Sequence, residues 1–342
     1  MVSKLRTVGW VLAGTALALT VRSLTRRPRE SFAGKTVVIS GGSRGLGLEM
    51  ARLWTAEGAR VAICARDGDE IARALRELST KGGNAWGRVC DVTNAAEVNG
   101  FMDAVHQRFN RIDVVVNNAG VIQVGPENCM TASDYENALA THFWGPYHMI
   151  QAALPFLRRQ RGGRIVNISS IGGRISVPHL LPYCTSKFAL VGYSEGLATV
   201  LAEEGISVTT VTPGLMRTGS ARNAEFKGRH RAEYAMFGIA AALPGITVDS
   251  KTAARRIVEA CRRRDPALSV SWFSALASRV HGLCPGLTTT ALSLAHPHLP
   301  TDPDRSPEIR KGWQSESAWA PSWLTLLNDQ ASVRNNELAN GN

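Results

Sequence analysis

The sequence is poor in the residue groupings that define several protein classes. Its six cysteines include no C-x-x-C pair, and no cluster of histidines accompanies them. This scatter argues against a structural zinc site and indicates a reduced compartment. No internal repeat is evident. No apolar run reaches the roughly 18 residues that would identify a membrane-spanning helix without ambiguity.

Acidic residues are scarce relative to basic ones. The chain holds 28 Asp and Glu against 39 Lys and Arg, a formal net charge of +11. This excess predicts an anionic partner, namely a phosphate-bearing cofactor, an anionic lipid or a nucleic acid, unless it is only a solvated basic surface. The basic residues are not interleaved with aromatic ones, so nucleic acid is the least expected of these partners.

Residues 1–30 combine an apolar run, 8–21, with flanking basic residues. A helix over the run would be about 21 Å long, short of the ~30 Å hydrocarbon core of a bilayer. The heavier basic cluster, 22–29, follows the run and favours a cytoplasmic location for the downstream domain. We therefore expect a membrane anchor or an interfacial helix. Two alternatives stay open: Ala16-Leu17-Ala18 resembles a signal-peptidase site, and the segment could pack on the protein itself.

From Lys35 onward the pattern alternates between strands and helices. Strands are expected at 36–39, 59–64, 85–90, 112–117, 164–169 and 206–211. Helices are expected at 48–58, 67–81, 94–109, 134–159, 182–203 and 250–264. Regular alternation of this kind predicts an α/β fold in which helices cover both faces of a doubly wound parallel sheet.

The most informative stretch joins the first strand to the first helix. Residues 40–47 read SGGSRGLG, with glycines at 41, 45 and 47. A strand, a glycine-rich turn and a helix together point a helix N-terminus at a phosphate and let a pyrophosphate approach the backbone. The spacing is G-x-x-x-G-x-G, not the commoner G-x-G-x-x-G, so a turn that binds nothing remains the alternative.

Polar and glycine residues gather at the carboxyl ends of the other expected strands. These residues are Asp91, Asn117, Ser169-Ser170 and Pro213-Gly214. Ligands of open parallel sheets bind at this edge. The positions therefore predict one ligand site at the carboxyl end of the sheet.

Tyr183 and Lys187 stand at i and i+4 of one expected helix, so their side chains lie on one face. A tyrosine titrates at about 10 in water, and a neighbouring ammonium group lowers that pKa. Ser170, at the end of the preceding strand, is placed to bond a carbonyl or hydroxyl oxygen. Together the three predict a general acid/base site for a carbon–oxygen centre, although Tyr-x-x-x-Lys alone occurs by chance on many helices.

In this order the motifs resemble those of the short-chain dehydrogenase/reductase family in its compact single-domain form. The motifs are SGGSRGLG (40–47), DV (91–92), NNAG (117–120), ISS (168–170), YCTSK (183–187) and PG (213–214). The resemblance covers about residues 34–270. It implies a Rossmann-like NAD(P)-binding fold and transfer of a hydride between nicotinamide and an alcohol or carbonyl.

The same resemblance implies roles for individual residues. Tyr183 would be the acid/base, Lys187 would lower its pKa and hold the ribose hydroxyls, and Ser170 would orient the substrate oxygen. Asn117 and Gly120 would line the cofactor, and Thr218, in PGLMRT, would contact the carboxamide.

One position departs from the family pattern. A helix residue, usually Asn, completes a tetrad with the Ser, Tyr and Lys of family members, and here that place is His142. The Asn is thought to act largely through its backbone carbonyl, which a histidine would keep. The imidazole could also titrate and join a proton relay. Reduced or absent activity is the third possibility.

The residues around the adenosine site favour NADP(H) over NAD(H). NAD-preferring members carry an acidic residue at the end of the second strand, where this chain reads Ala65-Arg66. Arg44 lies close to the same ribose, and two guanidinium groups suit a 2′-phosphate. Alternatively, Arg66 only stacks on adenine and both cofactors bind.

The complete set of predicted cofactor-binding residues is Gly41, Ser43, Arg44, Gly45, Leu46, Gly47, Arg66, Asp91, Val92, Asn117, Ala119, Gly120, Tyr183, Lys187, Pro213, Gly214 and Thr218.

Three further segments complete the predicted organisation. Residues 215–245 interrupt the alternation and predict a lid. Residues 271–342 are expected to form a helical extension and a partly disordered tail, in which Trp313, Trp319 and Trp323 indicate docking. Within 268–299, apolar residues at helical spacing favour packing in the core over a membrane contact.

These features predict an NADP(H)-dependent oxidoreductase that acts on a lipophilic alcohol or carbonyl and associates with a membrane through residues 1–30. Its domain at 34–270 would be the catalytic unit, and a homo-oligomer is possible. Two alternatives remain: a non-catalytic NADP-binding regulatory protein, suggested by His142, and an isomerase or dehydratase on the same scaffold.

Overall fold

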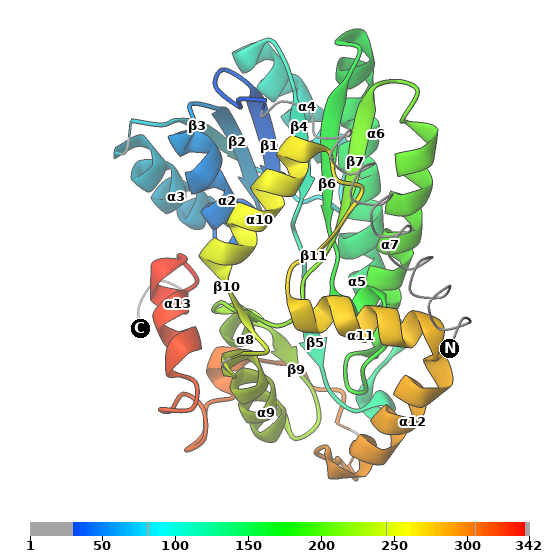
Figure 1. The fold of residues 1–342 in the computed structure, drawn as a ribbon. Helices are drawn as coiled ribbons and strands as arrows, with labels where there is room; N and C mark the ends of the chain where they lie inside the picture. The colour runs from blue at the N-terminus through cyan, green and yellow to red at the C-terminus, as the bar shows by residue number, and fades with distance from the viewer. Residues whose placement is uncertain (1–29, 81, 244, 305, 339–342) are drawn as a thin grey trace, which may run out of the picture. The chain divides into compact units, whose positions relative to one another are not determined.

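The computed structural model describes residues 30–80, 82–243, 245–304 and 306–338 (Figure 1). Phe32–Asn342 forms one compact unit. The expected anchor at 8–21 and the possible cleavage site at 16–18 lie outside the described residues. Among the residues that are described, no helix is both long and apolar enough to cross a membrane.

A seven-stranded parallel sheet forms the centre of this unit. Its strands are β1 (Thr36–Ser40), β2 (Arg60–Ala65), β3 (Asn84–Val89), β4 (Val114–Asn117), β6 (Gly163–Ile168), β7 (Ile206–Thr212) and β11 (Ala267–Ser269). Their order is β3-β2-β1-β4-β6-β7-β11, so the winding reverses between β1 and β4. The predicted doubly wound parallel sheet is confirmed, and a ligand crevice is expected at this reversal.

Helices cover both faces of the sheet (Figure 1). One face carries α2 (Gly45–Ala56), α3 (Gly68–Thr80) and α10 (Ser250–Arg263), and the other carries α4 (Ala95–Phe109), α6 (Gly145–Arg159) and α7 (Leu181–Val200). Successive strand residues serve opposite faces, because Val37 and Ile39 belong to the first core and Val38 to the second. Each face of the sheet thus buries a cluster of apolar side chains against its helices.

The prediction of one continuous helix at 134–159 is wrong in one respect. The structure has α5 (Ala132–Leu139), then a π-helical turn at Ala140–Trp144, then α6. A π-turn breaks the regular α-helical hydrogen-bond ladder and often marks a functional site. It contains His142, at the place of the expected tetrad residue.

Short elements surround the carboxyl end of the sheet. They are β5 (Gln123–Val124), β8 (Met216–Arg217), α8 (Ser220–Asn223), β9 (Glu225–Phe226), α9 (His230–Ala242), β10 (Val248–Asp249) and β12 (Arg310–Lys311). Short 3₁₀ turns lie at Glu127–Cys129, Ile171–Gly173, His296–His298 and Gly312–Gln314. The segment predicted as a lid, 215–245, thus holds α8 and α9.

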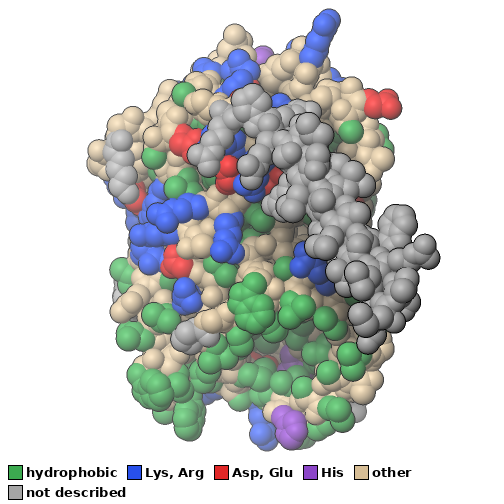
Figure 2. Space-filling model, viewed as in Figure 1, with side chains coloured by type: hydrophobic (Ala, Val, Ile, Leu, Met, Phe, Trp, Pro, Cys, Tyr) green, Lys and Arg blue, Asp and Glu red, His purple; other side chains and the backbone are tan. Residues whose placement is uncertain are grey.

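Two helices after β11 contradict the expectation of core packing at 268–299. In α11 (Trp272–Leu283) the buried residue is Ser274, and α12 (Pro285–Ala295) has none. Trp272, Leu276 and Leu283 are 66%, 50% and 83% exposed. Figure 2 shows hydrophobic side chains gathered on the lower half of this face, where α11 and α12 lie. The helices form where the apolar spacing predicts them, but their apolar side chains face outward.

The C-terminal region packs against the rest of the unit, though not through its tryptophans. Parts of this region dock as predicted, but Trp313, Trp319 and Trp323 are all exposed, so other residues make the contact. Small and polar residues of α13 (Leu326–Arg334) and its surroundings are buried instead: Ala320, Asn328, Ala331, Ser332, Asn335 and Glu337.

Candidate active site

The glycine turn between β1 and α2 is shaped by a close backbone approach. A Cβ on Gly47 would stand 2.0 Å from the Gly41 carbonyl oxygen, and Gly41 itself has a φ of +63°. Only glycine is compatible with either position. The Asn118 amide donates to the same Gly41 oxygen at 2.8 Å, so the end of β4 braces the turn. The motif NNAG contains Asn118, but its role as a brace was not foreseen.

The neighbouring Asn117 is buried within the sheet and does not face the turn. Its Nδ2 donates to Asn167 Oδ1 at 2.7 Å, and Asn167 donates to Ser194. Ala119 follows at the strand end, where its N–H donates to the Ser40 hydroxyl. Gly120 is exposed and lies against the His142 ring. The structure therefore places Ala119 and Gly120 at the sheet edge and gives Asn117 a link between strands.

Tyr183, Lys187 and Ser170 are brought together at the end of β6. Lys187 Nζ donates to the Ile168 carbonyl at 2.9 Å and lies 5.7 Å from the centroid of the Tyr183 ring. The Ser170 side chain hydrogen bonds the Tyr183 hydroxyl, and its oxygen also accepts from the Gly172 N–H. The predicted cluster is thus present, and its hydroxyl groups are directed at each other.

Burial dominates the protonation of this cluster. It raises the pKa of Tyr183 to about 12, against a smaller lowering by Ser170. It lowers the pKa of Lys187 to about 7. The expected lowering of the Tyr183 pKa by Lys187 is not seen, because the loss of hydration outweighs attraction to an ammonium that is itself disfavoured.

His142 is buried with both ring nitrogens engaged. The Val121 N–H donates to Nε2 at 3.1 Å, so the proton is assigned to Nδ1, which lies 2.7 Å from Ser186 Oγ. Ser186 in turn donates to the Tyr183 carbonyl at 2.8 Å. Burial, with the nearby charge of Lys187, holds the pKa of His142 well below its usual range. This ring is a neutral support for the first turn of α7.

The two arginines expected at the adenosine site differ in their surroundings. Arg44 donates to Glu70 Oε1 at 2.8 Å and to Asn223 Oδ1 at 3.1 Å, and Ser43 donates to the other Glu70 oxygen. Arg66 is exposed at the end of β2. Glu70 was not singled out in the sequence, because an acidic residue in the first turn of a helix is common.

The remaining predicted residues also lie at the carboxyl edge. The Asp91 carboxylate accepts from the Thr93 N–H and hydroxyl, and Val92 is buried. The Pro213 carbonyl accepts from the Ile171 N–H, and Thr218 is buried and donates to Ser220. Gly45 and Leu46 are the first two residues of α2, and Gly214 lies in the loop after β7.

A small recess opens beside Tyr183. Its lining is Val121, Gln123, Asp134, Asn137, Ala138, Tyr183 and Glu225. Asp134 pairs with the buried Lys227 at 2.6 Å and accepts from Gln123 at 2.7 Å. The recess therefore places polar side chains beside apolar ones next to Tyr183.

Comparison with known proteins agrees with this geometry. The family model described as short chain dehydrogenase matches residues 35–227. A putative ketoacyl reductase of the granaticin polyketide synthase from Streptomyces violaceoruber is 34% identical over 204 residues, 58% of this chain and 75% of that protein. A galactitol 2-dehydrogenase from Agrobacterium fabrum is 35% identical over 183 residues, 53% of this chain and 70% of that protein.

Solved structures give the same result. A short chain dehydrogenase/reductase from Burkholderia phymatum in complex with NAD has a TM-score of 0.69 at 25% identity, covering 76% of this chain and 96% of its own. A metagenomic short-chain oxidoreductase in complex with NADP has a TM-score of 0.52 at 33% identity, covering 54% and 84%. The chain belongs to the short-chain dehydrogenase/reductase family and is an oxidoreductase of alcohol or carbonyl groups.

The support role of His142 gives a testable consequence. His142→Asn should retain turnover with an unchanged pH–rate profile, because the neutral imidazole transfers no proton. His142→Ala should lower the free energy of unfolding by about 1–3 kcal/mol, since it leaves the Val121 N–H unpaired. Steady-state kinetics and denaturant unfolding measure the two effects. A collapse of kcat in His142→Asn with a shifted pH profile would instead place the imidazole in the proton path.

The low pKa of Lys187 predicts a pH-dependent stability. Between pH 7 and about 10, the unfolded chain binds a proton at Lys187 that the folded chain does not, so folding is favoured as the pH rises. Across that window, the free energy of unfolding of the native protein should rise relative to that of Lys187→Met by about 1 kcal/mol per pH unit. Urea unfolding of both proteins at pH 7, 8 and 9 measures the difference. Parallel stability curves would show that Lys187 keeps its charge when folded.

Proposed function

We propose that the protein is an NADP(H)-dependent oxidoreductase that interconverts an alcohol and a carbonyl at the Ser170–Tyr183–Lys187 cluster. One observation carries the proposal. The Tyr183 hydroxyl stands at the edge of the sheet where the glycine turn also lies. Ser170 hydrogen bonds this hydroxyl, and the buried Lys187 lies on the same helix as Tyr183.

The glycine turn fits a dinucleotide. The Gly41–Gly47 approach leaves no room for side chains, and α2 begins at Gly45, so its N-terminus is directed at a pyrophosphate. Gly41 to Gly47 and Thr218 would hold the pyrophosphate and carboxamide side of the cofactor, and Lys187 the ribose hydroxyls. When bound, the nicotinamide supplies or accepts the hydride, and its oxidised form carries a positive charge.

The chain's own residues would handle the proton. In the reducing direction, Tyr183 Oη gives its proton to the carbonyl oxygen as the carbonyl carbon gains a hydride, and Ser170 holds that oxygen in place. Burial keeps Tyr183 protonated, which suits an acid. In the reverse direction, a cationic neighbour is needed to lower the pKa of Tyr183. The oxidised nicotinamide would supply this charge, together with Lys187 in the molecules where it is protonated.

Removing the hydroxyl tests this assignment. Tyr183→Phe should lower kcat at least 10²–10⁴-fold, since a positioned acid/base contributes about that much. NADPH binding should persist, because the glycine turn is untouched. Absorbance assays over a panel of carbonyls and equilibrium binding of NADPH measure the two quantities. Turnover at the native rate in this variant would eliminate the mechanism.

The preference for NADP(H) depends on Arg44 and Arg66. Arg66 is exposed at the end of β2, but Arg44 would have to share its guanidinium with Glu70. Replacing both with glutamine should weaken NADPH far more than NADH, because only NADPH carries the 2′-phosphate. Each lost charge-assisted bond is worth about 1.5–3 kcal/mol. Equal losses of affinity for both cofactors, measured by titration, would show that the arginines do not read the phosphate.

A lipophilic substrate and a membrane location are supported by the exposed faces of α11 and α12. Between Asp265 and Asp302 the chain has no acidic residue, and Arg279 is its single Lys or Arg. Exposed Trp272, Leu276 and Leu283 would suit the interface of an anionic bilayer, on the cytoplasmic side where NADPH is found. The polar side chains of the recess beside Tyr183 would then bind the oxygen-bearing end of the substrate.

Fractionation tests the membrane location. Full-length protein should sediment with membranes and resist release by high salt, because an inserted apolar segment is not screened. A chain without residues 1–30 should leave the membrane fraction at high salt and still bind NADPH, since Phe32–Asn342 is a compact unit of its own. A mature N-terminus just after Ala18 in exported protein would overturn the anchor.

A further inference from the structure

The segment that follows α13 runs directly over the glycine turn. The Asn335 carbonyl accepts the Gly45 N–H at 2.9 Å, at the first residue of α2. The Asn336 side chain donates to the Ser43 carbonyl at 2.9 Å and to the Glu70 carbonyl at 3.1 Å. Backbone groups of the turn and of the α2 N-terminus are therefore bonded by the chain's own C-terminal residues.

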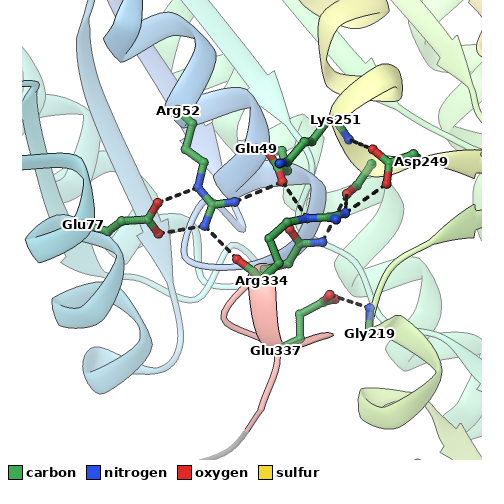
Figure 3. Close-up of polar contacts among 10 residues, drawn as sticks. Glu49, Arg52, Glu77, Gly219, Asp249, Lys251, Arg334 and Glu337 are labelled. Atoms are coloured by element: carbon green, nitrogen blue, oxygen red, sulfur yellow. Dashed lines mark hydrogen bonds and ion pairs between the residues drawn. The ribbon is translucent and has the colours of Figure 1, made fainter. Parts of the chain in front are cut away.

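Glu337 places a carboxylate at the same point. Its Oε2 accepts the Gly219 N–H at 2.5 Å (Figure 3), and its Oε1 would lie 3.1 Å from a Cβ on Gly45. The side chain is 5% exposed. Burial raises the pKa of Glu337 to about 7, while the Gly219 N–H and the charge of Arg44 lower it. An acidic group thus stands between the glycine turn and the loop after β7.

Ion pairs hold the helix that carries this segment. Arg334, at the end of α13, pairs with Asp249 at 3.0 Å and with Glu49 at 3.5 Å. Arg52 donates to the Arg334 carbonyl at 2.9 Å while pairing with Glu77 (Figure 3). These partners come from α2, α3 and the N-cap of α10, so α13 is tied to the helices that flank the turn.

We infer that residues 335–337, the C-terminal strap, occupy the place of the cofactor's pyrophosphate and must leave before a dinucleotide binds. Asn335 and Glu337 stand where a phosphate would meet the N-terminus of α2 and the Gly219 N–H. A docked strap and a bound pyrophosphate therefore exclude each other. The inference rests on the proposed use of the glycine turn as the dinucleotide site.

The consequence is intramolecular competition. Because the strap is tethered to the site that it fills, its effective concentration there is high whatever the protein concentration. The apparent dissociation constant for the cofactor is then raised by the inverse of the fraction of molecules whose strap is undocked. Anything that holds the strap away would activate the enzyme.

Affinity measurements on strap variants test this inference. Glu337→Ala and Asn336→Ala each remove side-chain contacts of the strap and leave every residue of the glycine turn unchanged. Both should bind NADPH and NADH about tenfold more tightly than the native protein in fluorescence titrations, since a charge-assisted bond or a pair of bonds is lost from the docked state. Glu308→Ala is the matched control, because Glu308 is an exposed glutamate of the same region that pairs with Arg310, and its affinity should be native.

Hydrogen exchange supplies a second readout. Saturating NADPH should protect residues 40–47 and increase exchange at 326–338 in the native protein. Unchanged affinity in both variants would overturn the inference. Weaker affinity in both, or protection of 326–338 by NADPH, would also overturn it and show that the strap covers a bound cofactor. If no variant binds either dinucleotide, the proposed function fails and the inference with it, whereas binding at native affinity contradicts the inference alone.

Discussion

The approach of the first turn of α2 to the end of β1 is the constraint on which the rest of the site depends. A Cβ on Gly47 would stand only 2.0 Å from the Gly41 carbonyl oxygen, so the absence of a side chain there lets α2 sit close to the end of β1 and direct its N-terminus over the sheet edge. Asn118 fixes the same carbonyl from β4, the strand beyond the point where the winding reverses. The next strand after β4 in the sheet is β6. Tyr183, Lys187 and Ser170 gather at the end of β6, so they lie at the same sheet edge as the glycine turn.

Much of this arrangement could be predicted from the sequence, since apolar strands, helical periods and turn glycines are local signals. The strands differ from the expected ranges by one or two residues, and the motifs at 40–47, 117–120, 168–170 and 183–187 meet at one edge. His142 could be located by its place in a motif, but its role depends on Val121 and Ser186, which no local pattern connects to it.

The C-terminal third was harder to predict because apolar side chains are exposed there and polar side chains make the buried contacts. Periodic apolar residues in α11 and α12 predict burial, yet Trp272 and Leu283 face outward. The tail docks through the side chains of Asn328 and Glu337, which bond the Gly238 carbonyl and the Gly219 N–H, and through Asn335, whose amide donates to the Ser250 hydroxyl. Specific long-range hydrogen bonds of this kind leave no periodic trace in a sequence.

Deuteride transfer tests the central claim most directly. A carbonyl substrate found by screening would be incubated with NADPH carrying deuterium at the transferable C4 position, and the product analysed by mass spectrometry. The account predicts one deuterium on the carbinol carbon for each NADPH oxidised, with transfer slowed at least 10²–10⁴-fold in Tyr183→Phe. Consumption of substrate without NADPH oxidation and without deuterium in the product would contradict hydride transfer and identify an isomerase or dehydratase.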